Sequence, residues 1–247
     1  MRLLAIDLTG RDGEIVADRC WQAGAAGIWE VDASTLRAGV EDDDVADFVA
    51  ALADLGPTDV TDVEAVELAG RSVTVPMAGH EIELWVPATV FGDATHPTTA
   101  TCLSMLESAV RAGDAVLDVG SGTGALSIAA ALQGAQVTAI DVDPEAVTAT
   151  ADNAVRNGVT VAASATPLAD VLGTFDVVVA NMTVGSLGPL MPGLVARTRA
   201  GGTVIVSGLL EDQWPDVEAV LAGERSAVRV VDGWVTAAVV LGGSGDA

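Results

Sequence analysis

The sequence predicts an α/β fold: a doubly wound, mostly parallel sheet with an antiparallel C-terminal hairpin, preceded by a small ferredoxin-like α+β domain. Two observations indicate the sheet. Short apolar runs alternate with helical periodicities over residues 96–247, and a Gly-x-Gly-x-Gly turn joins one run to a helix. The small domain is indicated by a β-α-β-β-α-β order of segments within residues 1–70. Residues 71–95 are expected to form a connector.

Residues 1–70 contain short, regular segments and no chemical motif. Their apolar residues recur at strand or helix spacing, and glycine, proline and aspartate separate the segments. We therefore expect this domain to present a surface. The expected elements are strands at 2–8, 27–31, 35–40 and 60–68 and helices at 12–23 and 41–55.

The connector is expected to hold a β-hairpin around Gly79, followed by a loop rich in hydroxyl side chains. Pro97 suits the first position of a helix, which we expect to run to about Val110. His96 and two threonines stand at the start of this helix. There they can cap the helix, contact a ligand, or do both.

The most informative segment is 115–124, in which a buried-strand pattern ends in Gly120, Gly122 and Gly124 and a helical segment follows at once. Glycine lets a backbone approach a ligand with no Cβ in the way. The helix N-terminus offers unpaired N–H groups to a polar or anionic group. The segment therefore predicts a site for a nucleotide-like cofactor.

The spacing around this turn favours S-adenosylmethionine over a dinucleotide. Asp118 lies two positions before Gly120, where a cofactor that carries an ammonium group needs a carboxylate. Gly124 falls one position early for the dinucleotide pattern. A second apolar run, 137–140, ends at Asp141, about 20 residues on, where an acid accepts hydrogen bonds from ribose hydroxyls. This last feature fits either cofactor.

The remainder of the chain continues as alternating strands and helices. Ligands of such sheets bind at the carboxyl ends of the strands. Because Asp118, Gly120, Asp141 and Asn181 all lie at or near predicted strand ends, we expect them to converge on one site. The expected elements are a helix from 143 to 158, strands at 159–163, 175–180 and 203–207, helices at 187–199 and 217–221, and a hairpin of 228–231 and 235–241.

The charge balance disfavours nucleic acid as a direct partner. The chain has 35 acidic and 11 basic residues, a net charge of −24, which repels phosphates. A basic protein would be attracted. A proteome-wide composition bias or salt adaptation would produce the same acidity, so the charge by itself supports a basic substrate only weakly.

Other classes of site and location are also disfavoured. Two histidines and two scattered cysteines cannot build an ordinary zinc site, so we expect no metal. Cys20 and Cys102 are expected to be buried free thiols in a reducing cytoplasm. No apolar run is long enough to span a membrane, and the first apolar run is too short for a secretory signal. We therefore expect a cytoplasmic protein.

Five segments, in this order, resemble the ribosomal protein L11 methyltransferase family, and the resemblance covers nearly the whole chain. It is most specific in the loop 95–99, Thr-His-Pro-Thr-Thr. The resemblance implies an S-adenosylmethionine-dependent methyltransferase with a Rossmann-like domain over 96–247. It also implies that residues 1–70 recognise the substrate, a ribosomal protein methylated on lysine side-chain and N-terminal amines. The segments are 91–99, 116–124, 141–145, 152–158 and 178–182.

The resemblance also implies roles for single residues. Thr99, Gly120, Asp141 and Asn181 would contact S-adenosylmethionine. Asn181 is the expected catalytic residue, since its side chain can orient an amine by accepting hydrogen bonds. Asp118 is expected to pair with the methionine ammonium rather than to act as a base. The full expected cofactor set is Thr99, Asp118, Gly120, Gly122, Gly124, Asp141 and Asn181.

Departures from the family pattern keep other functions open. The family usually has Thr-Gly where this chain has Asp93-Ala94, which adds a carboxylate beside the expected site and removes glycine freedom. An aliphatic pair usually follows the asparagine, where this chain has Met182-Thr183. A methyltransferase acting on another protein or on a small molecule, and a non-catalytic module that binds S-adenosylmethionine, therefore remain alternatives.

Overall fold

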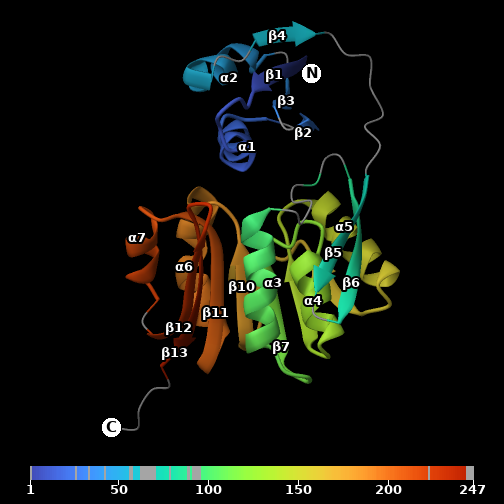
Figure 1. The fold of residues 1–247 in the computed structure, drawn as a ribbon, viewed down its shortest axis with the longest axis vertical. Helices are drawn as coiled ribbons and strands as arrows, with labels where there is room; N and C mark the ends of the chain where they lie inside the picture. Colours follow the sequence, from blue (N-terminus) through green and yellow to red (C-terminus); the bar gives the residue numbers. More distant parts are fainter. Residues whose placement is uncertain are drawn as a thin grey trace. The chain divides into compact units, whose positions relative to one another are not determined.

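The computed structural model describes residues 2–25, 27–32, 34–41, 43–55, 58–61, 71–77, 79–87, 90, 96–221 and 223–242. The chain divides into two compact units (Figure 1). The first comprises Met1–Gly70 with Pro87–Thr89, and the second comprises Arg71–Val86 with Val90–Ala247.

The first unit is built on a four-stranded sheet in the order β2-β3-β1-β4, in which all neighbouring strands are antiparallel. Alternate residues of β1 and β3, such as Leu4 and Ala38, stand opposite each other and are buried. Val16 and Phe48 from the two helices join the same cluster, so both helices cover one face of the sheet. The elements are β1 (Arg2–Asp7), α1 (Gly13–Gln22), β2 (Gly27–Asp32), β3 (Thr35–Val40), α2 (Val45–Ala51), the 3-10 turn η1 (Ala53–Leu55) and β4 (Thr58–Thr61).

Two expected elements of this unit differ from the structure. The helix expected over 41–55 is shorter, because it begins at Val45 and its last part tightens into η1, where Leu55 N donates to Leu52 O. The strand expected over 60–68 begins at Thr58 and is described to Thr61, and residues 62–68 lie outside the described residues.

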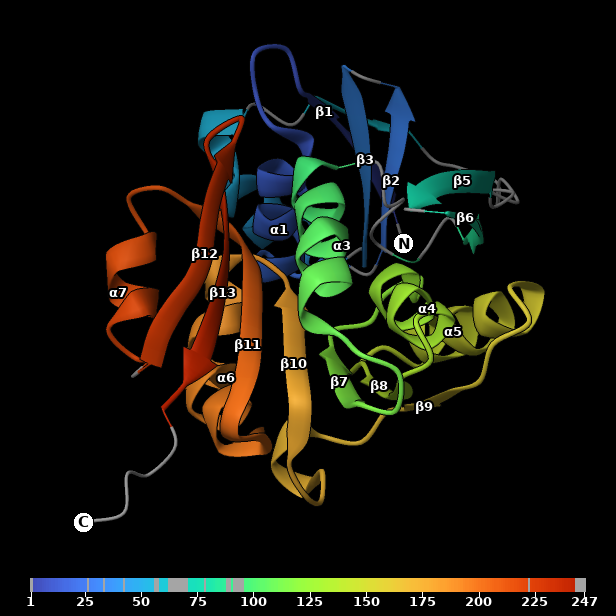
Figure 2. The same cartoon turned by 60° about the horizontal axis from the view of Figure 1, so that its bottom comes forward.

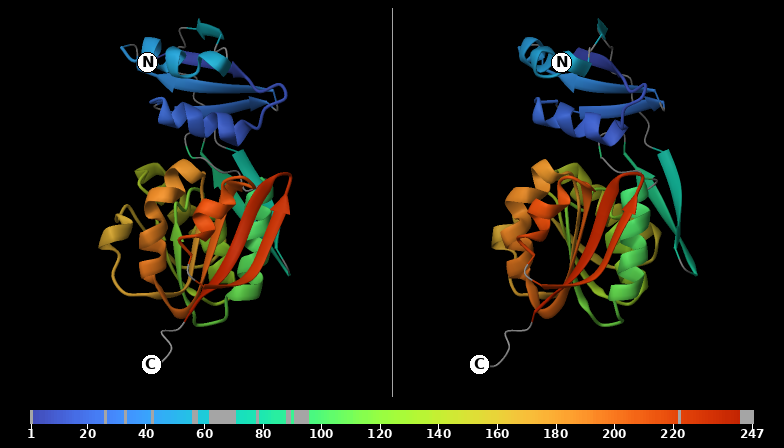
Figure 3. Two further views of the ribbon diagram at one scale, coloured as in Figure 1. Left: turned by 90° about the vertical axis from the view of Figure 1, so that its left-hand side faces the viewer. Right: turned by 60° about the vertical axis from the view of Figure 1, so that its left-hand side comes forward.

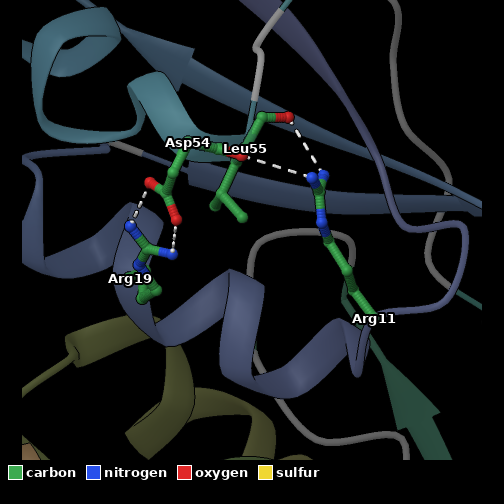
Figure 4. Close-up of polar contacts among 4 residues, drawn as sticks. All are labelled: Arg11, Arg19, Asp54 and Leu55. Atoms are coloured by element: carbon green, nitrogen blue, oxygen red, sulfur yellow. Dashed lines mark hydrogen bonds and ion pairs between the residues drawn. The ribbon is translucent and has the colours of Figure 1, made fainter.

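Two surface arginines, Arg11 and Arg19, form hydrogen bonds with the end of η1 (Figure 4). The Arg19 guanidinium donates to both carboxylate oxygens of Asp54, at 2.8 and 2.7 Å, and this lowers the pKa of Asp54 to about 2. Arg11 donates to the carbonyl of Leu55 at 3.0 Å and to that of Asp54 at 3.3 Å. The terminal carbonyls of η1 therefore gain partners from positively charged groups.

The second unit holds a seven-stranded sheet in the order β12-β13-β11-β10-β7-β8-β9, which can be followed across Figure 2. Strands β7 to β11 run parallel, and β13 runs antiparallel between β11 and β12. The predicted doubly wound α/β sheet is confirmed. Its elements are β7 (Ala115–Val119), α4 (Ala125–Leu132), β8 (Gln136–Ile140), α5 (Pro144–Arg156), β9 (Val161–Ser164), η2 (Leu168–Asp170), β10 (Phe175–Asn181), α6 (Val184–Arg197), β11 (Thr198–Leu210), α7 (Trp214–Glu218), β12 (Gly223–Val231) and β13 (Trp234–Leu241).

Helices cover both faces of this sheet (Figure 3). Val177 and Val179 of β10 point into one apolar cluster, whereas Val178 and Ala180 point into the other. This explains why the strand reads as a continuous apolar run, as buried parallel strands do. The first cluster also buries α3 (Pro97–Ala109) and the hairpin of β5 (Arg71–Met77) and β6 (His80–Val86).

The helix expected over 187–199 is present with bounds shifted by three residues at its start and two at its end. Helix α6 begins at Val184, behind Thr183, and contains both Pro189 and Pro192. Pro189 favours a later start, because proline fits the first turn and disrupts the interior of a helix. Buried side chains on this helix, Leu187 and Met191 among them, pack on the sheet and hold the helix through both prolines.

Strand β11 starts at Thr198, five residues before the expected start, because Thr198 already pairs with Phe175 of β10. Both cysteines are buried and free, and burial raises the pKa of each thiol to about 12, so neither is a reactive thiolate. Within the described residues, no helix has both the length and the apolar character needed to cross a bilayer.

Candidate cofactor site

The glycine turn connects β7 to α4 at the carboxyl end of the central parallel strand. Gly120, Gly122 and Gly124 have φ angles of 75°, 54° and 85°, which strain any residue with a Cβ. A Cβ at Gly120 would lie 2.6 Å from Cε of Met182, and one at Gly124 would lie 3.0 Å from Cα of Thr150. Backbone conformation requires all three glycines. The backbone of Thr150 adds a steric requirement at Gly124, whereas the Met182 methyl beside Gly120 is the end of a flexible side chain.

Asp118 is buried in β7, with 1% of its surface exposed. Its Oδ2 accepts a hydrogen bond from Ser127 Oγ at 2.6 Å, whereas its buried Oδ1 has no hydrogen-bond partner among the described residues. Burial and the charge of Asp141 raise the pKa of Asp118 to about 6, against the lowering effect of the Ser127 hydrogen bond. An unpartnered buried carboxylate oxygen is costly until a donor or cation meets it. This orphaned oxygen fits an ammonium group.

Asp141 follows β8 and is bound to the glycine turn. Its Oδ2 accepts from the Gly122 N–H at 2.9 Å and its Oδ1 from the Asp143 N–H at 3.0 Å. The Gly120 N–H donates to the carbonyl of Ile140 at 2.9 Å. Because each carboxylate oxygen can accept a second hydrogen bond, Asp141 retains capacity for ligand hydroxyls.

Asn181 ends β10 and contacts the start of α3. Its Nδ2 donates to Thr98 Oγ1 at 3.2 Å and to Thr99 Oγ1 at 3.3 Å. Both contacts use the amide nitrogen, so the carbonyl oxygen Oδ1 is the atom suited to an incoming donor. The structure thus brings the predicted residues Thr99 and Asn181 together.

His96 caps helix α3. Its Nδ1 accepts a hydrogen bond from the Thr98 N–H at 3.3 Å and lies 2.9 Å from Thr98 Oγ1. Pro97 follows His96 at the first helical position. The imidazole ring also meets Trp234 edge-on, with 5.1 Å between ring centroids. Capping is therefore the role that the geometry gives to His96, and through Thr98 it supports Asn181.

Met182 lies against both the glycine turn and Gly208 of β11. Its side-chain methyl reaches Gly120, and its backbone passes so close to Gly208 that a Cβ there would overlap the Met182 carbonyl. Gly208 also has a φ of 84°. We did not single out Gly208 from the sequence, although a glycine within a strand pattern signals a close backbone approach.

Three further residues at this site were also missed. Thr98 is 1% exposed and contacts Asn181, but nothing in the motif distinguishes it from its neighbour Thr99. Val142, beside Asp141, is 92% exposed, which is unusual for an aliphatic side chain and readable only from the fold. Asn153 lies in the segment 152–158, one of the five that resemble the family, but the sequence indicated no role for it. Asp93 and Ala94, the residues that depart from the family pattern, lie outside the described residues.

Comparison with known proteins identifies the family. Residues 55–239 match the family model described as ribosomal protein L11 methyltransferase (PrmA). The ribosomal protein L11 methyltransferase of Dechloromonas aromatica is 47% identical over 139 residues, which cover 55% of this chain and 46% of the relative. That of Bordetella parapertussis is 44% identical over 154 residues, which cover 60% and 49%. The chain thus spans about half the length of the curated relatives it matches.

Solved structures agree with this assignment. The ribosomal protein L11 methylase from Lactobacillus delbrueckii subsp. bulgaricus has a TM-score of 0.58 and 35% identity, over 62% of this chain and 81% of that chain. A 16S rRNA methyltransferase of T. thermophilus, solved with AdoMet and guanosine, has a TM-score of 0.59 over 96% and 64% of the two chains. At 19% identity, it shows the fold alone. The family match and the residues of the glycine turn together show that this chain belongs to the ribosomal protein L11 methyltransferase family.

Proposed function

We propose that this chain is an S-adenosylmethionine-dependent N-methyltransferase that modifies lysine or N-terminal amines of a ribosomal protein. The observation that carries the proposal is the buried Oδ1 of Asp118, which has no hydrogen-bond partner among the described residues. It lies just before the glycine turn, at the sheet edge that also holds Asp141 and Asn181. Such an edge is where open α/β sheets bind their ligands. The names of the curated relatives point to the substrate.

Each expected cofactor residue would contact a different part of S-adenosylmethionine. Asp118 would pair with the methionine ammonium, Asp141 would accept from the ribose hydroxyls, and the glycines would allow close backbone approach. The exposed side chain of Val142 would supply an apolar contact for the adenine ring of the cofactor. When bound, S-adenosylmethionine supplies a methyl group on a positively charged sulfur, ready for transfer to a nucleophile.

Asn181 would orient the substrate amine. A lysine side chain has a pKa of about 10.4, so removing its proton at pH 7 costs about 4.6 kcal/mol. A poorly hydrated site lowers this cost, because burial disfavours the charged form. The Asn181 Oδ1 would accept a hydrogen bond from the neutral amine and aim its lone pair, with Thr98 and Thr99 holding the amide.

The first unit is proposed as a ferredoxin-like substrate-recognition domain over residues 1–70, joined by the connector 71–95 to the catalytic domain 96–247. Its strand order, β2-β3-β1-β4, and its two helices on one face support that architecture. Residues 1–70 carry 16 acidic and 4 basic residues, which favours a basic partner. A ribosomal protein in the cytoplasm meets this description.

Incubation of the purified chain with ribosomal proteins and isotope-labelled S-adenosylmethionine tests the proposal. Mass spectrometry should find added methyl groups on lysine or N-terminal amines of one ribosomal protein. Cofactor binding without transfer to any ribosomal protein would instead support the non-catalytic alternative.

A further inference from the structure

Three polar side chains form a stripe along one face of α5: Thr150, Asn153 and, at the residue that ends the helix, Asn157. Their spacing of three and four residues places them on the same side of a helix. Thr150 and Asn153 are fully buried, and Asn157 is half-buried. Buried polar groups need partners, and the partners of this stripe lie on two separate segments, the hairpin strand β6 and the glycine turn.

On β6, the two asparagines take the place of a neighbouring strand. Asn153 Nδ2 donates to the Trp85 carbonyl at 2.9 Å while its Oδ1 accepts from the Trp85 N–H at 2.7 Å. Asn157 repeats the pattern on Glu83, with distances of 2.7 and 2.9 Å. Residues two apart on a strand direct their N–H and C=O groups to the same edge. The side-chain amides therefore hold the free edge of the hairpin against α5.

On the glycine turn, the stripe holds two successive carbonyls. Asn153 Nδ2 also donates to the Thr123 carbonyl at 2.9 Å, and Thr150 Oγ1 donates to the Gly122 carbonyl at 3.0 Å. Because each peptide unit is planar, fixing a carbonyl also fixes the direction of the N–H across the same bond. The side chains of α5 thus set the orientation of the turn that approaches the cofactor.

We propose that the stripe is a template that sets the shape of the glycine turn and fastens it to the hairpin β5–β6, with Asn153 as the positioning residue shared by both. Asn153 therefore connects the hairpin β5–β6 to the glycine turn within the second unit. The proposal rests on the proposed function only for the identity of the ligand.

A matched pair of asparagine variants in the full chain tests the shared role. Asn153→Ala and Asn157→Ala each remove one amide from β6, but only Asn153→Ala releases Thr123. Calorimetry with S-adenosylhomocysteine should show binding weaker by about tenfold or more for Asn153→Ala. For Asn157→Ala, the Kd should change by less than about threefold. Equal weakening in both variants, or no weakening in either, would overturn the proposal.

A second pair keeps the proposal testable if Asn153→Ala does not fold. Thr150→Val removes the hydroxyl that holds the Gly122 carbonyl at nearly constant volume, whereas Thr150→Ser retains it. The valine variant should bind S-adenosylhomocysteine about tenfold more weakly, and the serine variant should bind as the unaltered chain does. Equal affinity of the two variants contradicts the template role.

Hydrogen exchange without ligand separates this proposal from the proposed function. The amide of Gly124, which donates to the Ser121 carbonyl and shares a peptide unit with the Thr123 carbonyl, should exchange at least about tenfold faster in Asn153→Ala and be unchanged in Asn157→Ala. If that pattern appears while the unaltered chain binds no S-adenosylhomocysteine, the template stands and the cofactor assignment fails. Unchanged exchange in Asn153→Ala refutes the template itself.

Discussion

The two units of this protein differ in where they hold their polar side chains. In the part of the chain that the structure describes, every buried polar side chain belongs to the second unit, and many of them gather around the glycine turn and the ends of β10 and β11. The first unit buries apolar side chains such as Ile6 and Phe48, while its ion pair between Arg19 and Asp54 lies at the surface. Buried polar groups reduce stability unless they are fully partnered. The difference places the candidate cofactor site in the second unit and supports the proposal that the first unit binds the substrate through its surface.

Deleting residues 1–70 should produce the largest effect. Methylation of the ribosomal protein should fall by about a thousandfold or more, because remote binding energy is lost. The Kd for S-adenosylmethionine should stay within about threefold, since every expected cofactor residue lies beyond the deletion. Labelled-methyl transfer and calorimetry on the same preparation measure the two quantities. Efficient protein methylation by the truncated chain would show that the first unit is not the recognition domain.

Asn181→Ala should reduce kcat by about a hundredfold, because the amine loses its orienting acceptor. The Kd for the cofactor should change by less than about tenfold. Asn157→Ala, the same substitution outside the reacting edge, is the control and should keep kcat within about threefold. Full activity of Asn181→Ala would remove Asn181 from its assigned role.

Asp118→Asn should weaken S-adenosylmethionine binding by about tenfold or more at pH 7, since the ammonium loses its ionised partner. In the unaltered chain, affinity should fall as the pH drops below about 6, where the pKa of Asp118 lies and the carboxylate becomes protonated. Calorimetry between pH 5 and 8 should show this dependence in the unaltered chain and its loss in the variant. Identical pH profiles would place the ammonium elsewhere.

The stability of the ligand-free protein should respond in the opposite direction. The folded-state pKa of Asp118, about 6, lies above its ordinary value of 3.8, so the folded chain binds more protons between those pH values. The contribution of Asp118 to the free energy of unfolding is fully present below about pH 4 and is lost as the pH rises through about 6. Asp118→Asn should therefore stabilise the ligand-free chain at pH 7, by up to about 3 kcal/mol, and little at pH 4. Thermal melts at both pH values decide, and a less stable variant at pH 7 would contradict the assignment.

Arg19→Ala should have the smallest effect. The ion pair with Asp54 is exposed, with 34% and 64% of the two side chains accessible, so solvent and salt screen it. We expect only a small loss in unfolding free energy, which salt reduces further, and no change in cofactor affinity. Denaturant unfolding at low and high salt measures the first, and calorimetry the second. A larger loss that salt does not reduce would mean that this contact organises the first unit.

The sequence predicted the glycine turn and its flanking strands well, because the signals are local. Three glycines at positive φ and a short, mostly apolar run such as 115–119 constrain the chain whatever surrounds them. It placed the start of α6 three residues late, at 187 instead of Val184. The two prolines within that helix argue for a boundary, and only the packing of its buried face on the sheet outweighs them.

In the candidate site, too, local sequence patterns predict some features and tertiary packing decides the others. Short-range patterns are enough to indicate that Asp118, Asp141 and Asn181 follow or end strands, since periodicity and glycine conformation depend on near neighbours. Only tertiary packing joins Asn181 to the start of α3 and brings Asn153 of α5 onto both Thr123 and Trp85. It also leaves Asp118 Oδ1 with no partner in the part of the chain that the structure describes. These contacts join residues far apart in sequence, and their geometry follows from how strands and helices stack rather than from any local preference.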